Sequence, residues 1–162
     1  MVRLFLFLAM LAVAAPSAAG VVFARGSWAA ITGVGQCAAG ARSILQARKD
    51  RVQAHAAFAF DAGGPRHGEL AIRLSRPPRA GSSVILTVGE RPFLLATRGD
   101  WAWSRGPAQE AAIIAEVRAA GSMRVVFRGA NGIRYTDRYL LDGAPGAIDA
   151  AAAACAGKMR RS

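Results

Sequence analysis

Regular alternation of apolar residues with smaller or polar ones is clearest around residue 70, where Leu70, Ile72 and Leu74 recur at every second position. A period of two predicts a strand that buries one face. The earlier stretch VQAHAAFAF has the same period, which places Phe58 and Phe60 on one side. We therefore predict two strands here, separated by the loop DAGGPRHG.

Two β-hairpins are predicted further along the chain. Residues 83–88 and 91–97 are apolar runs on either side of a tight turn in which Gly89 can adopt a positive φ. Asn131 and Gly132 form a dipeptide that favours a type I′ turn, since both central positions of that turn need a positive φ. Apolar and aromatic residues flank this second turn: Val125, Phe127, Tyr135 and Tyr139.

The pattern changes to helical spacing in two places. Residues 107–120 have a proline at the start, Pro107, and a glycine immediately after the end, Gly121. Residues 145–156 are rich in alanine, begin with Pro145 and are followed by a basic tail, residues 157–162. Four residues give the first helix its apolar side: Ala112, Ile113, Val117 and Ala120.

These elements together indicate a mainly β protein. Weaker strand signals, separated by glycine or charged residues, fill the segment before residue 60. Many short strands with two short helices are typical of an antiparallel sandwich or a partly closed barrel with the helices packed on it. We expect one such domain over residues 26–156.

The first residues have the layout of a secretory signal peptide: one positive charge at Arg3, an apolar run, then proline and small residues. The apolar run is about a dozen residues, shorter than the roughly 20 that span a bilayer as a helix. Cleavage after Ala19 is the first expectation, and cuts after Gly20 or Ala24 are alternatives. An uncleaved membrane anchor, extended by the apolar residues that follow, is the other interpretation. If the segment is a cleaved signal peptide, we expect a periplasmic or secreted protein of a Gram-negative bacterium, with no transmembrane span after cleavage.

Both cysteines, Cys37 and Cys155, lie outside the signal peptide. Because an exported chain enters an oxidising compartment, an even pair predicts a single disulfide. Two buried free thiols are the alternative. A metal site is not expected, since two cysteines and two distant histidines lack ligand spacing.

Little in the sequence indicates catalysis. A nucleophilic site needs a serine or cysteine, a histidine and an orienting carboxylate. The histidines, His55 and His67, lie in a predicted strand and a glycine-rich loop, and neither is part of a known motif. We predict no catalytic residue, no cofactor and no metal, and therefore no enzyme. A small periplasmic hydrolase remains an alternative.

Trp101 and Trp103 share one side of the chain if the segment WAW is extended, and they could form a stacking platform for a sugar or a base. Together with Arg98 and Arg105 they are the candidate binding surface. The alternative is that the two indoles cap the core or cover a sheet, which buries a large area. Trp28 is expected to anchor the first strand of the domain.

The formal net charge is +11, of which the signal peptide contributes only the charge of Arg3. A basic surface attracts anionic partners. Export makes nucleic acid an unexpected partner and favours an anionic component of the envelope, lipopolysaccharide or a host-cell surface. The alternative is that the charge only maintains solubility.

The order of these features resembles the invasion associated locus B family of small exported bacterial proteins. That family has a turn of the form vG…pf.L, then a helix, an m.v strand and a Y.L.G…Al stretch. This chain has the same order over most of residues 26–156, but it lacks a further cysteine close to the first. The matching positions are Val88-Gly89, Pro92-Phe93, Met123-Val125 and Tyr139-Leu141-Gly143-Ile148.

The resemblance implies an immunoglobulin-like antiparallel β-sandwich in the periplasm or outer envelope and, for the founding members, an association with entry into host cells. It implies no catalytic site. We therefore expect an exported, non-enzymatic envelope protein with a binding or accessory role. The alternative is a module that binds carbohydrate or an anionic surface through Trp101, Trp103 and surface arginines.

Overall fold

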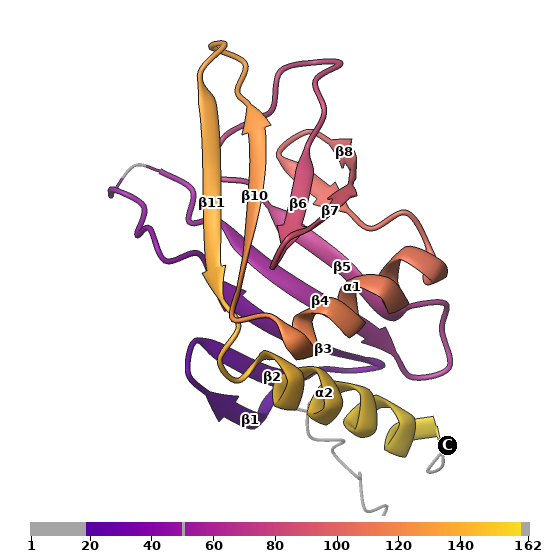
Figure 1. Ribbon diagram of the computed structural model, residues 1–162. Helices are drawn as coiled ribbons and strands as arrows, with labels where there is room; N and C mark the ends of the chain where they lie inside the picture. The colour runs from indigo at the N-terminus through magenta and orange to yellow at the C-terminus, as the bar shows by residue number, and fades with distance from the viewer. Residues whose placement is uncertain (1–18, 50, 160–162) are drawn as a thin grey trace, which may run out of the picture.

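The computed structural model describes residues 19–49 and 51–159. These residues form two antiparallel sheets, of seven and four strands, and two helices (Figure 1). The mainly β antiparallel sandwich with two helices is confirmed, as an open sandwich with sheets of unequal size. The expected signal peptide lies outside the described residues except for Ala19, and so do the last three residues of the basic tail.

The large sheet begins as a meander in which successive strands are neighbours, and it ends with two short strands from later in the chain. Strong alternation buries one face of it, and Leu70, Ile72 and Leu74 are fully buried as predicted. Its first strand precedes residue 26, where we expected the domain to begin. The order across the sheet is β1 (Gly20–Arg25), β2 (Trp28–Thr32), β3 (Gln36–Arg42), β4 (His55–Asp61), β5 (His67–Arg73), β9 (Trp101–Trp103) and β8 (Ala96–Arg98).

The small sheet consists of the two predicted hairpins joined side by side. The turn between the strands of the first hairpin contains Gly89 with a φ of +56°, a conformation that glycine adopts without strain. This hairpin is confirmed. The order across the sheet is β11 (Arg134–Leu140), β10 (Ser122–Arg128), β6 (Ile85–Val88) and β7 (Arg91–Leu94).

The second hairpin is present, but its predicted type I′ turn is wrong. No residue other than glycine has a positive φ in the described chain, so Asn131 cannot occupy a type I′ position. The N–H of Gly132 donates to the carbonyl of Gly129 (2.8 Å), and the N–H of Gly129 donates to the carbonyl of Ile133 (2.8 Å). Gly132 then takes a positive φ of 79°. The loop is therefore a turn followed by a glycine bulge, which needs only one residue with a positive φ.

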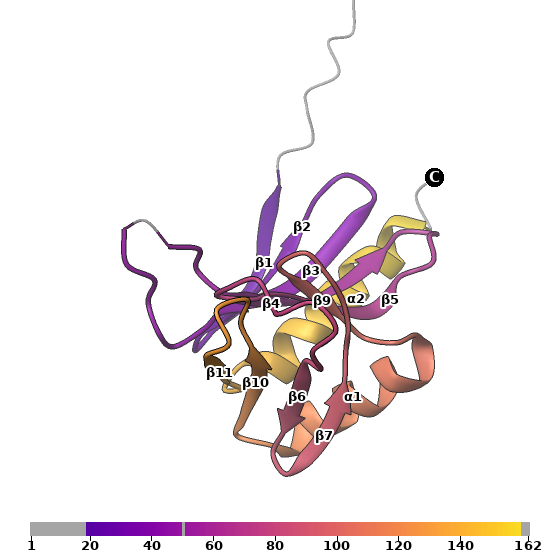
Figure 2. The ribbon, with the colours of Figure 1, turned by 90° about the horizontal axis from the view of Figure 1, so that it is seen from above.

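Both predicted helices are confirmed as α1 (Pro107–Ala119) and α2 (Ala144–Met159). The second continues into the segment expected to be a basic tail. Both helices and the small sheet lie on the same side of the large sheet, with α2 along β1, β2 and β3 (Figures 1 and 2). Gly143, just before α2, has a φ of +87°, and a Cβ there would fall on the carbonyl oxygen of Arg25. Only glycine therefore allows the end of β1 to approach the start of α2 so closely.

Trp28 joins the two sheets. Its side chain is almost fully buried, and its indole N–H donates to the carbonyl oxygen of Leu140 at 2.7 Å. The ring also packs against Phe58, with ring centroids 5.9 Å apart. A buried tryptophan usually satisfies its N–H in this way, so Trp28 anchors β2 to β11 as well as filling the core.

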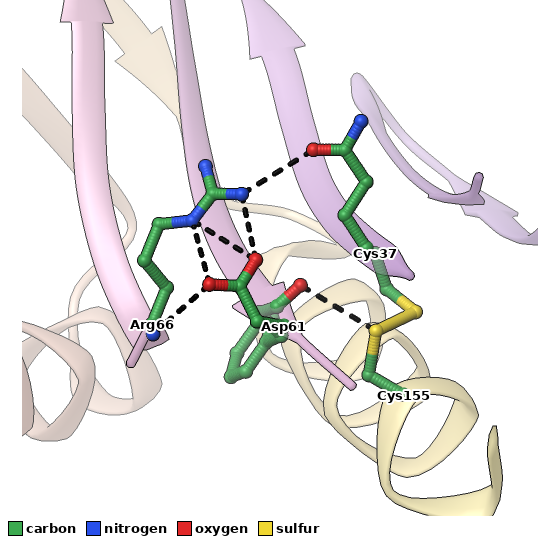
Figure 3. A network of polar contacts seen from close by, with 6 residues as sticks. Cys37, Asp61, Arg66 and Cys155 are labelled. Atoms are coloured by element: carbon green, nitrogen blue, oxygen red, sulfur yellow. Dashed lines mark hydrogen bonds and ion pairs between the residues drawn. A yellow bond between two sulfur atoms is a disulfide. The ribbon is translucent and has the colours of Figure 1, made fainter. Parts of the chain in front are cut away.

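A disulfide connects Cys37 of β3 to Cys155 of α2 (Figure 3). The two Cα atoms are 5.8 Å apart, and 118 residues separate them in sequence. Ala147 and Ala151, on the same helix, are fully buried. Their small side chains let the helix backbone lie close to the sheet, which brings Cys155 within reach of β3.

Candidate functional site

The outward face of the large sheet carries an aromatic group that we call the tryptophan cluster: His55, Arg73, Trp101 and Trp103. Because side chains alternate along β9, the two indoles point outward while Ala102 between them is buried. The indole rings stack nearly parallel, with centroids 6.3 Å apart and an interplanar angle of 18°. Both side chains are half-buried, so they cover the sheet and still present an indole surface to solvent.

Strand register completes the cluster. His55, Arg73 and Trp101 are successive cross-strand neighbours on β4, β5 and β9. The imidazole meets the Trp101 ring edge-on at 5.4 Å, and the Arg73 guanidinium lies 5.8 Å from the ring centroid. Arg73 also forms an ion pair with Asp100 (3.0 Å). Sequence reasoning missed His55 and Arg73 as members, because the pairing of β5 with β9 spans a long insertion that the alternation pattern does not reveal.

The other two candidate residues have different surroundings. Arg98 of β8 is paired with Trp101 across the strands, so it extends the same outward row. Arg105 lies beyond the end of β9, where its N–H donates to the Gln109 side chain (2.7 Å) and its guanidinium reaches the Leu95 carbonyl (3.4 Å). The fold thus brings Arg98 to the two tryptophans and places Arg105 at the start of α1.

A hollow of about 650 Å³ lies on the same face, over β2 and β3. Its floor is made of small outward residues, Ala29, Ala38 and Gly40, and its walls include the exposed aliphatic side chains Ile31 and Ile44. His55 lines the hollow and also touches the tryptophan cluster. His55 therefore connects the hollow to the tryptophan cluster on this face.

Several groups that could take part in nucleophilic catalysis make structural contacts in the described residues. Both cysteines are in the disulfide, and His55 Nδ1 faces the backbone carbonyl of Gln53 at 3.3 Å. The buried Ser104 hydroxyl donates to Glu110 (3.1 Å) and accepts from the Leu70 N–H (3.1 Å), which ties α1 to the large sheet. In the same part of the chain, no three His, Cys, Asp or Glu residues gather as metal ligands do. Nor does any described helix combine the length and apolar character needed to cross a membrane.

Asp61 and Arg66 close the loop between β4 and β5 near the disulfide (Figure 3). The carboxylate accepts hydrogen bonds from the guanidinium, the shorter at 2.6 Å, and from the Arg66 backbone N–H at 3.2 Å. These hydrogen bonds to Arg66 hold the pKa of Asp61 below its usual range. Arg66 also reaches the Gln36 side chain on β3 (3.3 Å), so the pair fastens three strands.

A second carboxylate, Asp137, has the opposite environment on β11. It faces the interior, where one of its oxygens accepts the N–H of Ser75 at 2.9 Å. Burial raises the pKa of Asp137 above its ordinary value, since the charged form loses water. Burial also raises the pKa of Tyr139, two residues further along the same strand.

Comparison with known proteins gives one informative result. No protein-family model and no curated protein sequence matches the chain. The fold is that of a solved invasion-associated protein. A crystal structure of invasion associated protein B from Bartonella henselae superposes with a TM-score of 0.61 and 16% sequence identity, and covers 85% of this chain and 98% of that chain. The predicted resemblance is thereby confirmed at the level of the fold.

The positions that carried the resemblance have structural roles. Val88, Met123, Tyr139 and Ile148 are buried in the core. Gly143 has the positive φ described above. These residues of the chain therefore serve packing and turns, and a binding site has to be inferred from its surface.

Proposed function

We propose that this protein is exported and acts in the bacterial periplasm or at the cell surface as a non-enzymatic binding or accessory protein. The disulfide between Cys37 and Cys155 carries the proposal, because such a bond persists in oxidising compartments and is rare in the cytosol. The likeness in fold to an invasion-associated protein and the leader-like first residues support it. Invasion is named for the Bartonella protein; for this chain we propose an anionic component of the envelope or of a host surface as the partner.

Cell fractionation tests the proposal directly. The full chain is expressed in a Gram-negative host, and the protein of the periplasmic fraction is examined by mass spectrometry before and after alkylation. We expect a chain that begins at Gly20 and contains no free thiol. A cut after Ala24 would remove most of β1, so its detection would revise the boundary while supporting export. Full-length protein with both thiols free in the cytoplasm would refute the proposal.

The tryptophan cluster favours a second candidate function, the binding of a glycan. Stacked, half-exposed indoles beside an apolar hollow can hold the apolar face of a sugar ring against them. The double variant W101A/W103A should lose glycan binding while its melting transition stays cooperative, and R105Q, which changes a residue outside the cluster, should retain it. If the parent protein binds no glycan in an array, this second function is removed.

A further inference from the structure

Four arginines project from the outward side of the small sheet, and we call this surface the arginine face. The strand register sets Arg124 directly opposite Arg138, and Arg128 directly opposite Arg134. All four side chains are exposed. Like charges at directly opposed positions destabilise a sheet, so this arrangement reduces stability in the isolated protein.

Nothing in the described chain neutralises this charge. The strands of the small sheet contain one acidic residue, Asp137, and its side chain points inward to the N–H of Ser75. Arg128 donates to the carbonyl of Gly132 (2.6 Å), which orients the guanidinium without cancelling its charge. In the same described residues, ion pairs involve other arginines: Arg25, Arg66, Arg73, Arg91 and Arg118.

Aliphatic side chains lie among these charges. Val126 is between Arg124 and Arg128 on the outward side of β10. The register continues this row to Ile85 on β6 and Leu94 on β7, which are 39% and 43% exposed. The arginine face therefore combines unpaired guanidinium groups with exposed aliphatic groups.

The positive surface continues around the free edge of β11. The N–H of Ile44 donates to the carbonyl of Arg138 (2.9 Å), which fastens the segment after β3 to this edge. A hollow of about 310 Å³ between them is lined by Arg48, Arg51, Arg76 and Arg134, and Asp137 is the one acidic residue in its lining. The guanidinium groups around it come from three different parts of the chain, and only the fold brings them together.

We propose that the arginine face binds the phosphate groups of an anionic lipid bilayer. Guanidinium groups bind phosphate oxygens in a bidentate manner, and each basic residue close to an anionic membrane strengthens binding about fivefold. Ile85 and Leu94 enter the boundary between headgroups and acyl chains, as apolar residues of peripheral proteins do. The inference rests on the proposed function, because export places the protein beside envelope membranes. Bound phosphates would also relieve the repulsion between the opposed arginines.

Vesicle sedimentation tests the proposal. The protein is purified from whichever cell fraction contains it, so that a failure of export is not mistaken for a failure of lipid binding. We expect binding to phosphatidylcholine vesicles only when they also contain phosphatidylglycerol, and weaker binding as salt rises. The variant R124Q/R138Q should bind at least about tenfold more weakly. The control R98Q/R105Q removes the same charge from β8 and the start of α1, outside the arginine face, and should bind within about twofold of the parent. Equal losses in the two variants, or undiminished binding by R124Q/R138Q, would overturn the proposal.

A second pair of measurements separates a membrane from other polyanions. I85S/L94S should weaken vesicle binding severalfold while leaving retention on a cation-exchange resin unchanged, because the resin offers charge without a hydrocarbon phase. If I85S/L94S binds vesicles like the parent, or if soluble polyglutamate binds as tightly as the vesicles, the partner is an acidic macromolecule and the lipid assignment is wrong. Circular dichroism and melting of each variant confirm that the fold is retained.

Discussion

The outward faces of the two sheets arrange their arginines differently. On the large sheet, Arg73 and Arg98 both face Trp101 across the strands and not another arginine, and Arg73 also pairs with Asp100. On the small sheet, the opposed pair Arg124 and Arg138 has no carboxylate partner in the described chain. The first arrangement stabilises the fold by itself, and the second is favourable only when an external anion supplies the missing charge. The positions of the arginines without a carboxylate partner are therefore more informative than the net charge of +11.

The sheets also differ in how they are fastened. The large sheet is tied to α2 by the disulfide and to the loop after β4 by the Asp61–Arg66 pair. In the described residues, no disulfide joins the small sheet to the rest of the protein. It is held by the packing of buried side chains such as Leu86 and Val125 and by the contact of Leu140 with Trp28. The disulfide therefore ties the large sheet, and the directly opposed arginines belong to the small one.

The largest expected effect comes from removing the covalent tie. Cys155→Ser, or reduction of the parent, should lower the free energy of unfolding by about 4 kcal/mol, because the bond closes a very long loop in the unfolded chain. Urea unfolding with and without dithiothreitol measures this. The double variant C37S/C155S should be insensitive to the reductant, and vesicle binding by the arginine face should persist wherever the variant is folded. Unchanged stability on reduction would show that the bond does not stabilise the large sheet.

Gly143→Ala should destabilise the fold by more than about 2 kcal/mol, since the new Cβ combines a strained positive φ with a clash against backbone. Gly157→Ala is the matched control, because it lies near the end of the same α2 and a Cβ there meets nothing within 4 Å. Thermal melting compares the two variants. Equal melting temperatures would mean that the approach of β1 to α2 tolerates a side chain.

The two carboxylates predict opposite effects of pH. Asp61 has a lowered pKa in the folded state. Its contribution to the free energy of unfolding is therefore present above the unfolded pKa of about 4, and it is lost as pH falls through the folded-state pKa. Asp137 has a raised folded-state pKa, so its contribution is present below about pH 4 and is lost as pH rises through the folded value. Relative to the parent, D61N should therefore lose stability as pH rises, and D137N should gain it. Urea midpoints measured from acidic to neutral pH test this, and parallel trends in the two variants would contradict it.

The smallest effect tests the opposed arginines themselves. Arg138→Glu places a carboxylate across from Arg124 and should raise stability by about 0.2–1 kcal/mol. The double variant R124E/R138E places two carboxylates opposite each other, which restores the repulsion and should remove this gain. A double-mutant cycle therefore isolates the interaction. The same R138E variant should bind anionic vesicles more weakly than the parent. If R138E gains no stability and loses no vesicle binding, these charges do not interact across the strands.

Much of the fold could be predicted because local patterns determine it. Alternation identified β5 through Leu70 and Ile72, and helical spacing after Pro107 identified α1. The conformation at Asn131 could not be deduced, because the same dipeptide also fits a turn with a glycine bulge. The full tryptophan cluster could not be predicted, because it depends on the pairing of β5 with β9, which are far apart in the sequence. By contrast, the arginine face could have been predicted, because alternation around the predicted hairpin places these arginines on one side. Sequence reasoning missed it because it treated the arginines as spread along the chain.

The position of the disulfide has a consequence for how the protein matures. Its two sulfur atoms come from the third strand and the final helix, 118 residues apart. In a chain that is threaded across a membrane with its N-terminus first, Cys37 emerges early and has no partner of its own until almost the whole polypeptide has followed. If the protein is exported as we propose, the bond can form only once nearly all of the chain has crossed the membrane. A molecule with this bond would then be one that is almost completely translocated, and a stalled chain would carry a single free thiol near its beginning.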